Sequence, residues 1–239
     1  MNRPRPGSHI LFEDNHLLVA EKGIGCPVQA NRDSEIDTLN LLKAYLKRKY
    51  AKPGNVFLGL VHRLDREVGG IMVFAKTSKA AARLSEQIRR RAIGKRYLAV
   101  VRHTPEPPAG TLRHWLLKDR QRNRVSAFAA ERPGAKEAIL EYRALTMKNQ
   151  FALCSVDLIS GRPHQIRVQF AHSGHPLYGD RKYYPQCPSE QKEIGLWSAG
   201  IAFRHPVGQD RLRFFLPPPP RPPWQWFDPE LFADETLRS

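Results

Sequence analysis

Short apolar runs separated by polar turns dominate the first part of the chain, and they predict strands. Ile10–Phe12 and Leu17–Ala20 flank the turn signal Glu13-Asp14-Asn15, which predicts two paired strands. Gly70–Ala75 and Tyr97–Val101 are continuous apolar runs of strand length and predict buried strands. The pattern therefore indicates a sheet whose first strands lie close to the N-terminus.

Three segments have the spacing of helices instead. Leucines recur at helical intervals within Thr38–Tyr50, and Pro53-Gly54 ends that helix. Ser78 is the predicted N-cap of a helix that continues to about Arg91. A third helix is predicted over Pro163–Ser173, because proline suits the first helical position and Gly174 suits the left-handed residue after the last turn.

The middle and the end of the chain are rich in strand-like pieces. Glycine, proline and charged clusters separate these pieces, which suggests hairpins. The pieces are 111–117, 125–130, 138–145, 151–158, 197–203 and 211–216. A few helices among many strands favour an α+β fold, with a single domain built on a mixed, mostly antiparallel sheet and flanking helices.

The two ends of the chain differ from this domain in composition. We expect residues 1–9 to form a basic arm, residues 10–216 the domain, and residues 217–239 a proline-rich tail. Pro217–Pro223 excludes helix and central strand and predicts extended polyproline. The aromatic residues just beyond it predict that the tail packs back on the domain.

The charge of the chain indicates its partner. Among 239 residues, 39 lysines and arginines stand against 23 acidic residues, a formal charge of +16. Such an excess favours a polyanion, most commonly nucleic acid, with an anionic membrane surface as the alternative. No apolar run approaches the roughly 20 residues that span a bilayer, and no signal peptide is visible. Three widely separated cysteines predict free thiols, so we expect a cytoplasmic protein.

One candidate for chemistry is an aspartate among arginines. Arg63 and Arg66 flank Asp65, just before a Gly-Gly pair and a buried strand. Neighbouring guanidinium groups favour the ionised carboxylate, which can act as a nucleophile or a base. The alternative is a salt-bridged structural aspartate. Tyr97, which is predicted to begin a strand after Lys95, could stack on a nucleobase or simply close the edge of the core.

The second candidate is the segment Gly161–Arg167. Its glycine allows a tight turn into a helix, and the free amides at a helix start attract phosphate. His164 and Arg167 are three residues apart and so share one helical face. An ordinary basic surface helix is the alternative. A metal site is the competing interpretation, with five possible ligands: His62, Asp65, His164, His172 and His175. The sequence has no zinc-binding spacing, no phosphate-binding loop and no dinucleotide fingerprint.

Taken together and in order, these motifs resemble the RluA-type family of pseudouridine synthases. The family pattern begins with His-Arg-Leu-Asp, a glycine turn and a strand ending in Ala-Lys. It continues with Lys-x-Tyr-x-Ala, then Gly-Arg-x-His-Gln-Ile-Arg, and finally Gly-His-Pro and Gly-Asp-x-x-Tyr. The matching segments here are His62–Asp65 with Gly70 and Ala75-Lys76, Lys95–Ala99, Gly161–Arg167, Gly174–Pro176 and Gly179–Tyr183. An opening segment over 11–22 is also similar, so the resemblance covers roughly residues 10–216.

The resemblance implies an RNA uridine isomerase with a central RNA-binding cleft and no cofactor or metal. Asp65 is implied as the catalytic carboxylate, Arg167 as its ion-pair partner and Tyr97 as the ring that packs on the target uracil. Arg63 is implied to lie near the hole that an extruded base leaves in its stack. The other residues expected to bind RNA are His62, Arg66, Lys95, Arg162, His164 and Gln165.

The chain departs from the family pattern in two places. Val68-Gly69 stands where many members have Thr-Ser, and Pro163 replaces a frequent threonine. We expect a monomer that modifies ribosomal or transfer RNA, with no membrane partner. The alternatives are a catalytically silent RNA-binding relative and a metal-dependent RNA hydrolase.

Overall fold

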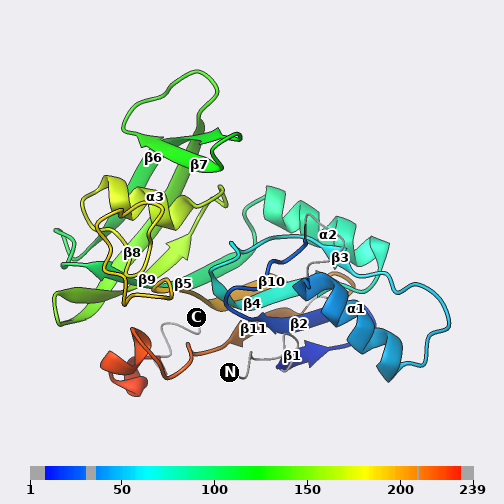
Figure 1. The fold of residues 1–239 in the computed structure, drawn as a ribbon. Coiled ribbons are helices and arrows are strands. Elements are labelled where there is room, and N and C mark those ends of the chain that lie inside the picture. The colour runs from blue at the N-terminus through cyan, green and yellow to red at the C-terminus, as the bar shows by residue number, and fades with distance from the viewer. Residues whose placement is uncertain (1–8, 31–35, 209, 233–239) are drawn as a thin grey trace. The chain divides into compact units, whose positions relative to one another are not determined.

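The computed structural model describes residues 9–30, 36–208 and 210–232. They form two compact units, the first within residues 1–93 and 200–216 and the second within 94–199 and 217–239. Apart from His9, the predicted basic arm lies outside the described residues, as do the last seven residues of the tail. Figure 1 follows the chain through both units.

The first unit is built on an antiparallel sheet. In it, β2 pairs with β1 on one side and with β4 on the other, and the short β3 also pairs with β4. Gly200–Arg204 of β10 pairs with β11. The bounds are β1 Ile10–Glu13, β2 Leu17–Lys22, β3 Gly59–Leu60, β4 Gly69–Ala75, β10 Leu196–Arg204 and β11 Arg211–Phe215. All seven residues of β4 are buried, as its continuous apolar sequence predicts.

Two helices belong to this unit, α1 (Thr38–Lys49) and α2 (Ser78–Arg89). The carboxylate of Asp37 caps α1 by accepting from the N–H of Asn40 at 2.7 Å. Thr77, and not the predicted Ser78, caps α2, because its hydroxyl accepts from the N–H of Ala80 at 3.2 Å. Leu84 of α2 packs into a core that β2 and β4 line.

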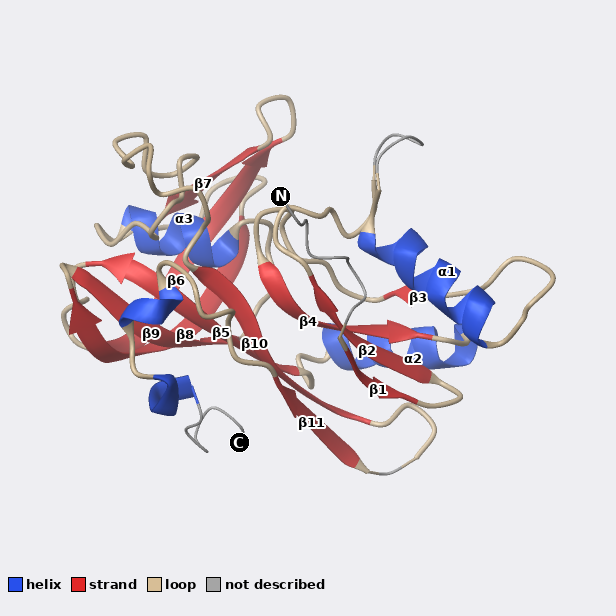
Figure 2. Ribbon diagram, turned by 60° about the horizontal axis from the view of Figure 1, so that its bottom comes forward, coloured by secondary structure: helices blue, strands red, loops and turns tan. Residues whose placement is uncertain are grey.

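The second unit is a five-stranded antiparallel sheet in the order β5-β9-β8-β6-β7. The predicted hairpins are present: β6 and β8 are longer than the sequence indicates, β9 has the predicted bounds, and β7 is one residue shorter. The bounds are β5 Gly94–Arg102, β6 Ala109–Asp119, β7 Arg124–Phe128, β8 Lys136–Lys148 and β9 Phe151–Leu158. Helix α3 (Gln165–His172) packs against β6 and β7 (Figure 2).

The start of α3 differs from the prediction. Pro163 lies outside the helix, and His164 has the left-handed φ of 52° at the position just before it. The side-chain oxygen of Gln165 accepts from the N–H of Arg162 at 3.0 Å, which holds the preceding loop against the first turn. The end of α3 agrees with the prediction, because Gly174 has the expected left-handed backbone, with a φ of +87°.

The tail packs on the second unit as expected, but the proline run is not extended throughout. The N–H of Arg221 donates to the carbonyl of Pro219 at 2.8 Å, and the N–H of Trp224 donates to the carbonyl of Arg221, so the chain turns. Trp224 is buried, and Trp226 packs on the rings of Phe151 and Tyr178. Two short 3-10 helices follow, Trp224–Trp226 and Pro229–Phe232.

The α+β class and the mostly antiparallel sheet with flanking helices are confirmed. The central cleft and the domain boundaries stay predictions. Within the described residues, every helix is too short or too polar to cross a bilayer.

Candidate active site

Asp65 lies on the loop between β3 and β4 in the first unit. Leu64 and Val68 are buried on either side of it, and the N–H of Val68 donates to the carbonyl of Asp65 at 3.1 Å. These contacts anchor the loop while leaving the Asp65 side chain half-buried. Arg63 and Arg66 are exposed beside it.

A second loop braces the Asp65 loop from the side of β2. The N–H of Gly25 donates to the carbonyl of Arg66 at 2.9 Å, and the Nε of Arg66 donates back to the carbonyl of Gly25 at 3.1 Å. This reciprocal pair joins segments 41 residues apart in sequence. It also gives Arg66 a positioning role in addition to its predicted role in RNA binding.

Lys22 is a residue of this site that the sequence did not single out. Its side chain is fully buried at the end of β2, and its ammonium donates to the carbonyls of Val68 at 2.6 Å, Gly23 at 3.0 Å and Arg66 at 3.1 Å. Burial lowers the pKa of Lys22 to about 8, against the raising influence of charges that include Asp65. Lys22 therefore holds the backbone of the Asp65 loop from within the core.

Behind the Asp65 loop, His62 contacts β4. Its Nε2 accepts from the N–H of Val73 at 3.0 Å. One ring nitrogen of His62 thus has a structural partner, and RNA contact through the remainder of the ring stays a prediction. Val68 and Gly69, which stand where the family often has hydroxyl residues, are both buried.

The second unit carries the other predicted residues. Tyr97 is buried within β5, which starts at Gly94 rather than at Tyr97, and faces Val156 of β9 across the ladder. Burial lowers the pKa of Lys95. The ammonium of Lys95 lies 3.5 Å from the position that a Cβ on Gly161 would take. The structure thus brings the Lys-x-Tyr strand and the start of the second motif together.

Gln165 fixes the loop that precedes α3. Its Oε1 accepts from the hydroxyl of Ser160 at 2.9 Å and from the N–H of Arg162 at 3.0 Å, while its Nε2 donates to the carbonyl of Ile139. The side chain is buried, so these contacts favour a positioning role over the predicted RNA contact. Arg162, in turn, donates from Nε to the carbonyl of Glu137 at 3.0 Å.

Arg167 forms a buried bidentate ion pair with Asp180. Its Nε and Nη2 each lie 2.8 Å from a carboxylate oxygen, and both side chains are almost completely buried. The guanidinium also lies over the ring of Tyr183, 5.5 Å from its centroid. The hydroxyl of Tyr183 is 2.7 Å from Nδ1 of His164 and accepts from a backbone N–H of β7. Asp180 and Tyr183 therefore join the Gly-Asp-x-x-Tyr motif to α3.

The implied pairing of Arg167 with Asp65 stays a prediction, because the two residues belong to different units. In the described part of the chain, no cluster of three or more histidine, cysteine or acidic side chains has the arrangement of a metal site.

Solved structures of known proteins share this fold. One is the human protein "RNA Pseudouridylate Synthase Domain Containing 4", with a TM-score of 0.73, 23% identity and 88% of each chain covered. Another is the human "RNA Pseudouridylate Synthase Domain Containing 1", with a TM-score of 0.71, 18% identity, and 92% of this chain and 87% of that one covered. The fold is thus that of a pseudouridylate synthase domain.

The chain belongs to the RNA pseudouridylate synthase family, whose model matches residues 16–172 and so includes both motifs. This confirms the resemblance to RluA-type enzymes. A similar relative is "Uncharacterized RNA pseudouridine synthase YhcT" of Bacillus subtilis, 35% identical over 179 residues, with 73% of this chain and 57% of that protein covered. "Ribosomal large subunit pseudouridine synthase C" of Vibrio vulnificus is 30% identical over 214 residues, covering 87% of this chain and 65% of that protein. The chain therefore spans less than two thirds of the length of these two relatives.

Proposed function

We propose that this protein isomerises specific uridines in RNA to pseudouridine. The observation that carries the proposal is the family match over residues 16–172, a range that includes the Asp65 loop and Gly161–Arg167. Large-subunit ribosomal RNA is the first substrate to test, because several relatives are named as ribosomal large subunit pseudouridine synthases. Transfer RNA is the second. We place the reaction in the cytoplasm with the protein as a monomer.

The reaction rearranges the target nucleotide without changing its composition. The N1–C1′ bond breaks, the uracil turns, and C5 bonds to C1′. A proton leaves C5 and a proton is taken up at N1, so neither a redox cofactor nor an outside group is consumed. Asp65 supplies the carboxylate that acts on the sugar or as a base, and Tyr97 packs on the uracil.

The described contacts support these roles through positioning. Lys22 and the Gly25–Arg66 pair fix the backbone that directly follows Asp65, which a reacting carboxylate needs because small misplacements are costly in rate. The Arg167–Asp180 pair fixes the plane of the guanidinium, which in this proposal is the ion-pair partner of the Asp65 carboxylate.

Loss of tritium from C5 tests the proposal. RNA carrying uridine tritiated at C5, transcribed without modification, is incubated with the protein in the presence of chelator. We expect release by the parent, loss of release in Asp65→Asn, and normal release in Asp210→Asn, a control that changes an exposed aspartate of the same unit. Binding without release by the parent would favour the silent relative. Strand cleavage only after metal addition would favour the hydrolase.

A further inference from the structure

The C-terminal end of α1 gathers positive charge without matching negative charge. Residues 38–64 contain no aspartate or glutamate, whereas five lysines and arginines fall between positions 43 and 52. Three of them are exposed and have no ion pair within the described residues: Lys47, Arg48 and Lys52. We call these three, together with Tyr50, the α1-end surface.

The helix cap brings these cations together. Ala51 has a left-handed φ of 46°, and its N–H donates to the carbonyl of Arg48 at 3.3 Å. The N–H of Lys52 donates to the carbonyl of Lys47 at 3.1 Å. This pair of bonds is the Schellman arrangement, in which the chain folds back over the last turn. Lys52 is therefore held beside Lys47 rather than leading away from the helix.

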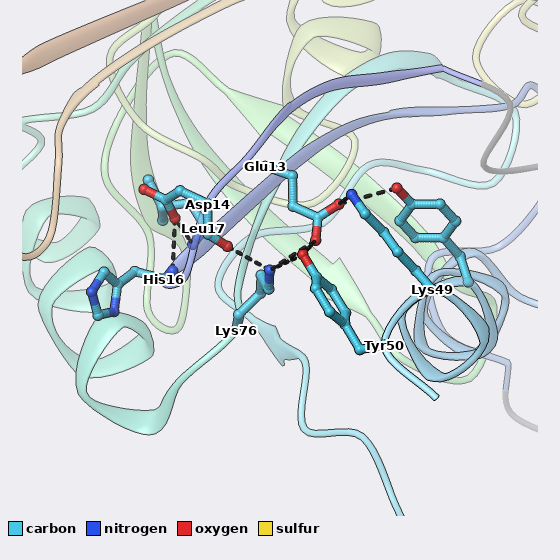
Figure 3. Close-up of polar contacts among 8 residues, drawn as sticks. Glu13, Asp14, His16, Leu17, Lys49, Tyr50 and Lys76 are labelled. Atoms are coloured by element: carbon cyan, nitrogen blue, oxygen red, sulfur yellow. Dashed lines mark hydrogen bonds and ion pairs between the residues drawn. The ribbon is translucent and has the colours of Figure 1, made fainter. Parts of the chain in front are cut away.

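Within the described residues, the carboxylate that contacts the end of α1 is that of Glu13, and it is already engaged. Glu13 has 6% of its side chain exposed and binds the ammonium groups of Lys49 and Lys76, each at 2.8 Å (Figure 3). It also accepts from the hydroxyl of Tyr50 at 2.6 Å. Burial alone would raise the pKa of Glu13, but these hydrogen bonds outweigh it and lower the pKa to about 2. Glu13 thus anchors the end of α1 and does not neutralise the α1-end surface.

Tyr50 is fixed by this anchor and yet half-exposed, at 47%. Its ring centroid lies 4.9 Å from the ammonium of Lys76, 5.5 Å from that of Lys49 and 6.0 Å from that of Lys52. An aromatic ring among cations suits an RNA strand, which offers phosphates and base faces together.

The helix dipole explains only part of this charge. It favours cations in the last turn only modestly, and Lys49 already satisfies that preference. At the end of α2, by comparison, two of the three consecutive arginines, Arg89 and Arg90, share the carboxylate of Glu86. At the end of α1, the exposed cations repel one another without such a partner.

We propose that the α1-end surface binds phosphates of the substrate RNA, as a contact separate from the Asp65 loop. The proposal rests on the proposed function for the identity of the ligand. It assigns α1 the task of holding RNA that flanks the reacting uridine, so that the Asp65 loop is left to act on the nucleotide itself.

The test compares two triple variants that remove equal charge from the first unit. One combines Lys47→Gln, Arg48→Gln and Lys52→Gln. The control combines Arg204→Gln, Arg211→Gln and Arg213→Gln, three exposed arginines of the β10–β11 hairpin. The probes are a fluorescein-labelled RNA hairpin with a uridine loop and unmodified large-subunit ribosomal RNA. Affinity is measured over a range of salt.

We expect the first variant to bind both RNAs at least tenfold more weakly at about 0.15 M salt, with a shallower salt dependence. Three lost duplex phosphate contacts reduce the slope of log K against log salt by up to about 2.7. The control variant should lose much less RNA affinity. The single variant Lys52→Glu changes a residue beyond the end of the helix and should show a smaller loss of RNA affinity. It keeps the proposal testable if the triple variant misfolds.

Two results would overturn the proposal. Equal losses in the two triple variants would mean that only total charge matters. Unchanged RNA affinity, with lost binding to phosphatidylserine vesicles, would assign the surface to a membrane. The binding measurement does not depend on catalysis. If the parent protein releases no tritium, only the proposed function is refuted. If the parent is active and the first triple variant binds RNA normally, only the role of the α1-end surface is refuted.

Discussion

Replacement of Lys22 by methionine tests how the Asp65 loop is held. Lys22→Met keeps the length and the apolar stem of the side chain but removes the ammonium that donates to the carbonyls of Gly23, Arg66 and Val68. We expect a less stable protein and a slower isomerisation, because the loop that carries Asp65 loses its internal support.

The size of the effect follows from two opposing contributions. Each buried acceptor left without a donor costs about 1–3 kcal/mol. The carbonyl of Arg66 keeps its bond from Gly25, so the main loss falls on Val68, whose bond to Lys22 is 2.6 Å long. Against this, removing a buried charge whose pKa has fallen from 10.5 to about 8 restores on the order of 3 kcal/mol. Because these two contributions are of similar size, we expect them to offset each other largely at neutral pH, with a net destabilisation of no more than about 1 kcal/mol there that grows at higher pH.

The dependence on pH gives the prediction its own signature. The unfolded chain binds the Lys22 proton more tightly than the folded protein does, so the free energy of unfolding rises with pH between the folded pKa of about 8 and the unfolded value of 10.5. The methionine variant lacks this rise. The difference between parent and variant should therefore widen by about 2 kcal/mol between about pH 7 and about pH 10.

Urea unfolding at several pH values, with tritium release measured in parallel, provides the assay. Lys79→Met, which changes an exposed lysine of α2, is the matched control and should leave both stability and turnover unchanged. A stability difference that stays constant across this pH range would refute the reasoning about the buried charge. Full turnover in Lys22→Met would refute the positioning role.

Three further changes probe the structure around the site. Arg167→Met should lower the free energy of unfolding by about 3–5 kcal/mol and abolish turnover, since it strands the buried carboxylate of Asp180; equal stability to the parent in urea would contradict this. Glu13→Gln should lower the free energy of unfolding by about 1–3 kcal/mol near pH 7. This loss should vanish as the pH falls from about 4.5 to about 2, because the carboxylate stabilises the fold only while it is ionised, and a pH-independent loss would contradict the prediction. Ala51→Gly should raise the free energy of unfolding by about 0.5–1 kcal/mol, because glycine adopts the left-handed cap of α1 without strain. A lower stability in thermal unfolding would contradict this.

The sequence was sufficient where local pattern decides structure. The continuous apolar run of β4 and the leucine spacing of α1 both predicted their elements closely. It was less reliable where a distant contact decides. The start of α3 moved from Pro163 to Gln165 because the Gln165 side chain bonds to Ile139, 26 residues away. No rule based on neighbouring residues could anticipate that bond.

The same distinction applies to the site. His62–Asp65 and Gly161–Arg167 were recognisable as motifs, because their residue types follow one another in sequence. Lys22 was missed as a site residue, since its acceptors Arg66 and Val68 lie 44 and 46 residues away. Asp180 appeared only as part of a motif, and its bidentate pairing with Arg167 emerges once α3 is folded.

Mapping pseudouridines in cellular RNA tests the central claim most directly. RNA is compared between cells that contain this protein, cells that lack it, and cells complemented with the parent or with Asp65→Asn. We predict that at least one pseudouridine, first sought in large-subunit ribosomal RNA, disappears without the protein, returns with the parent and does not return with Asp65→Asn. An identical map in all four samples, or restoration by Asp65→Asn, would contradict the account.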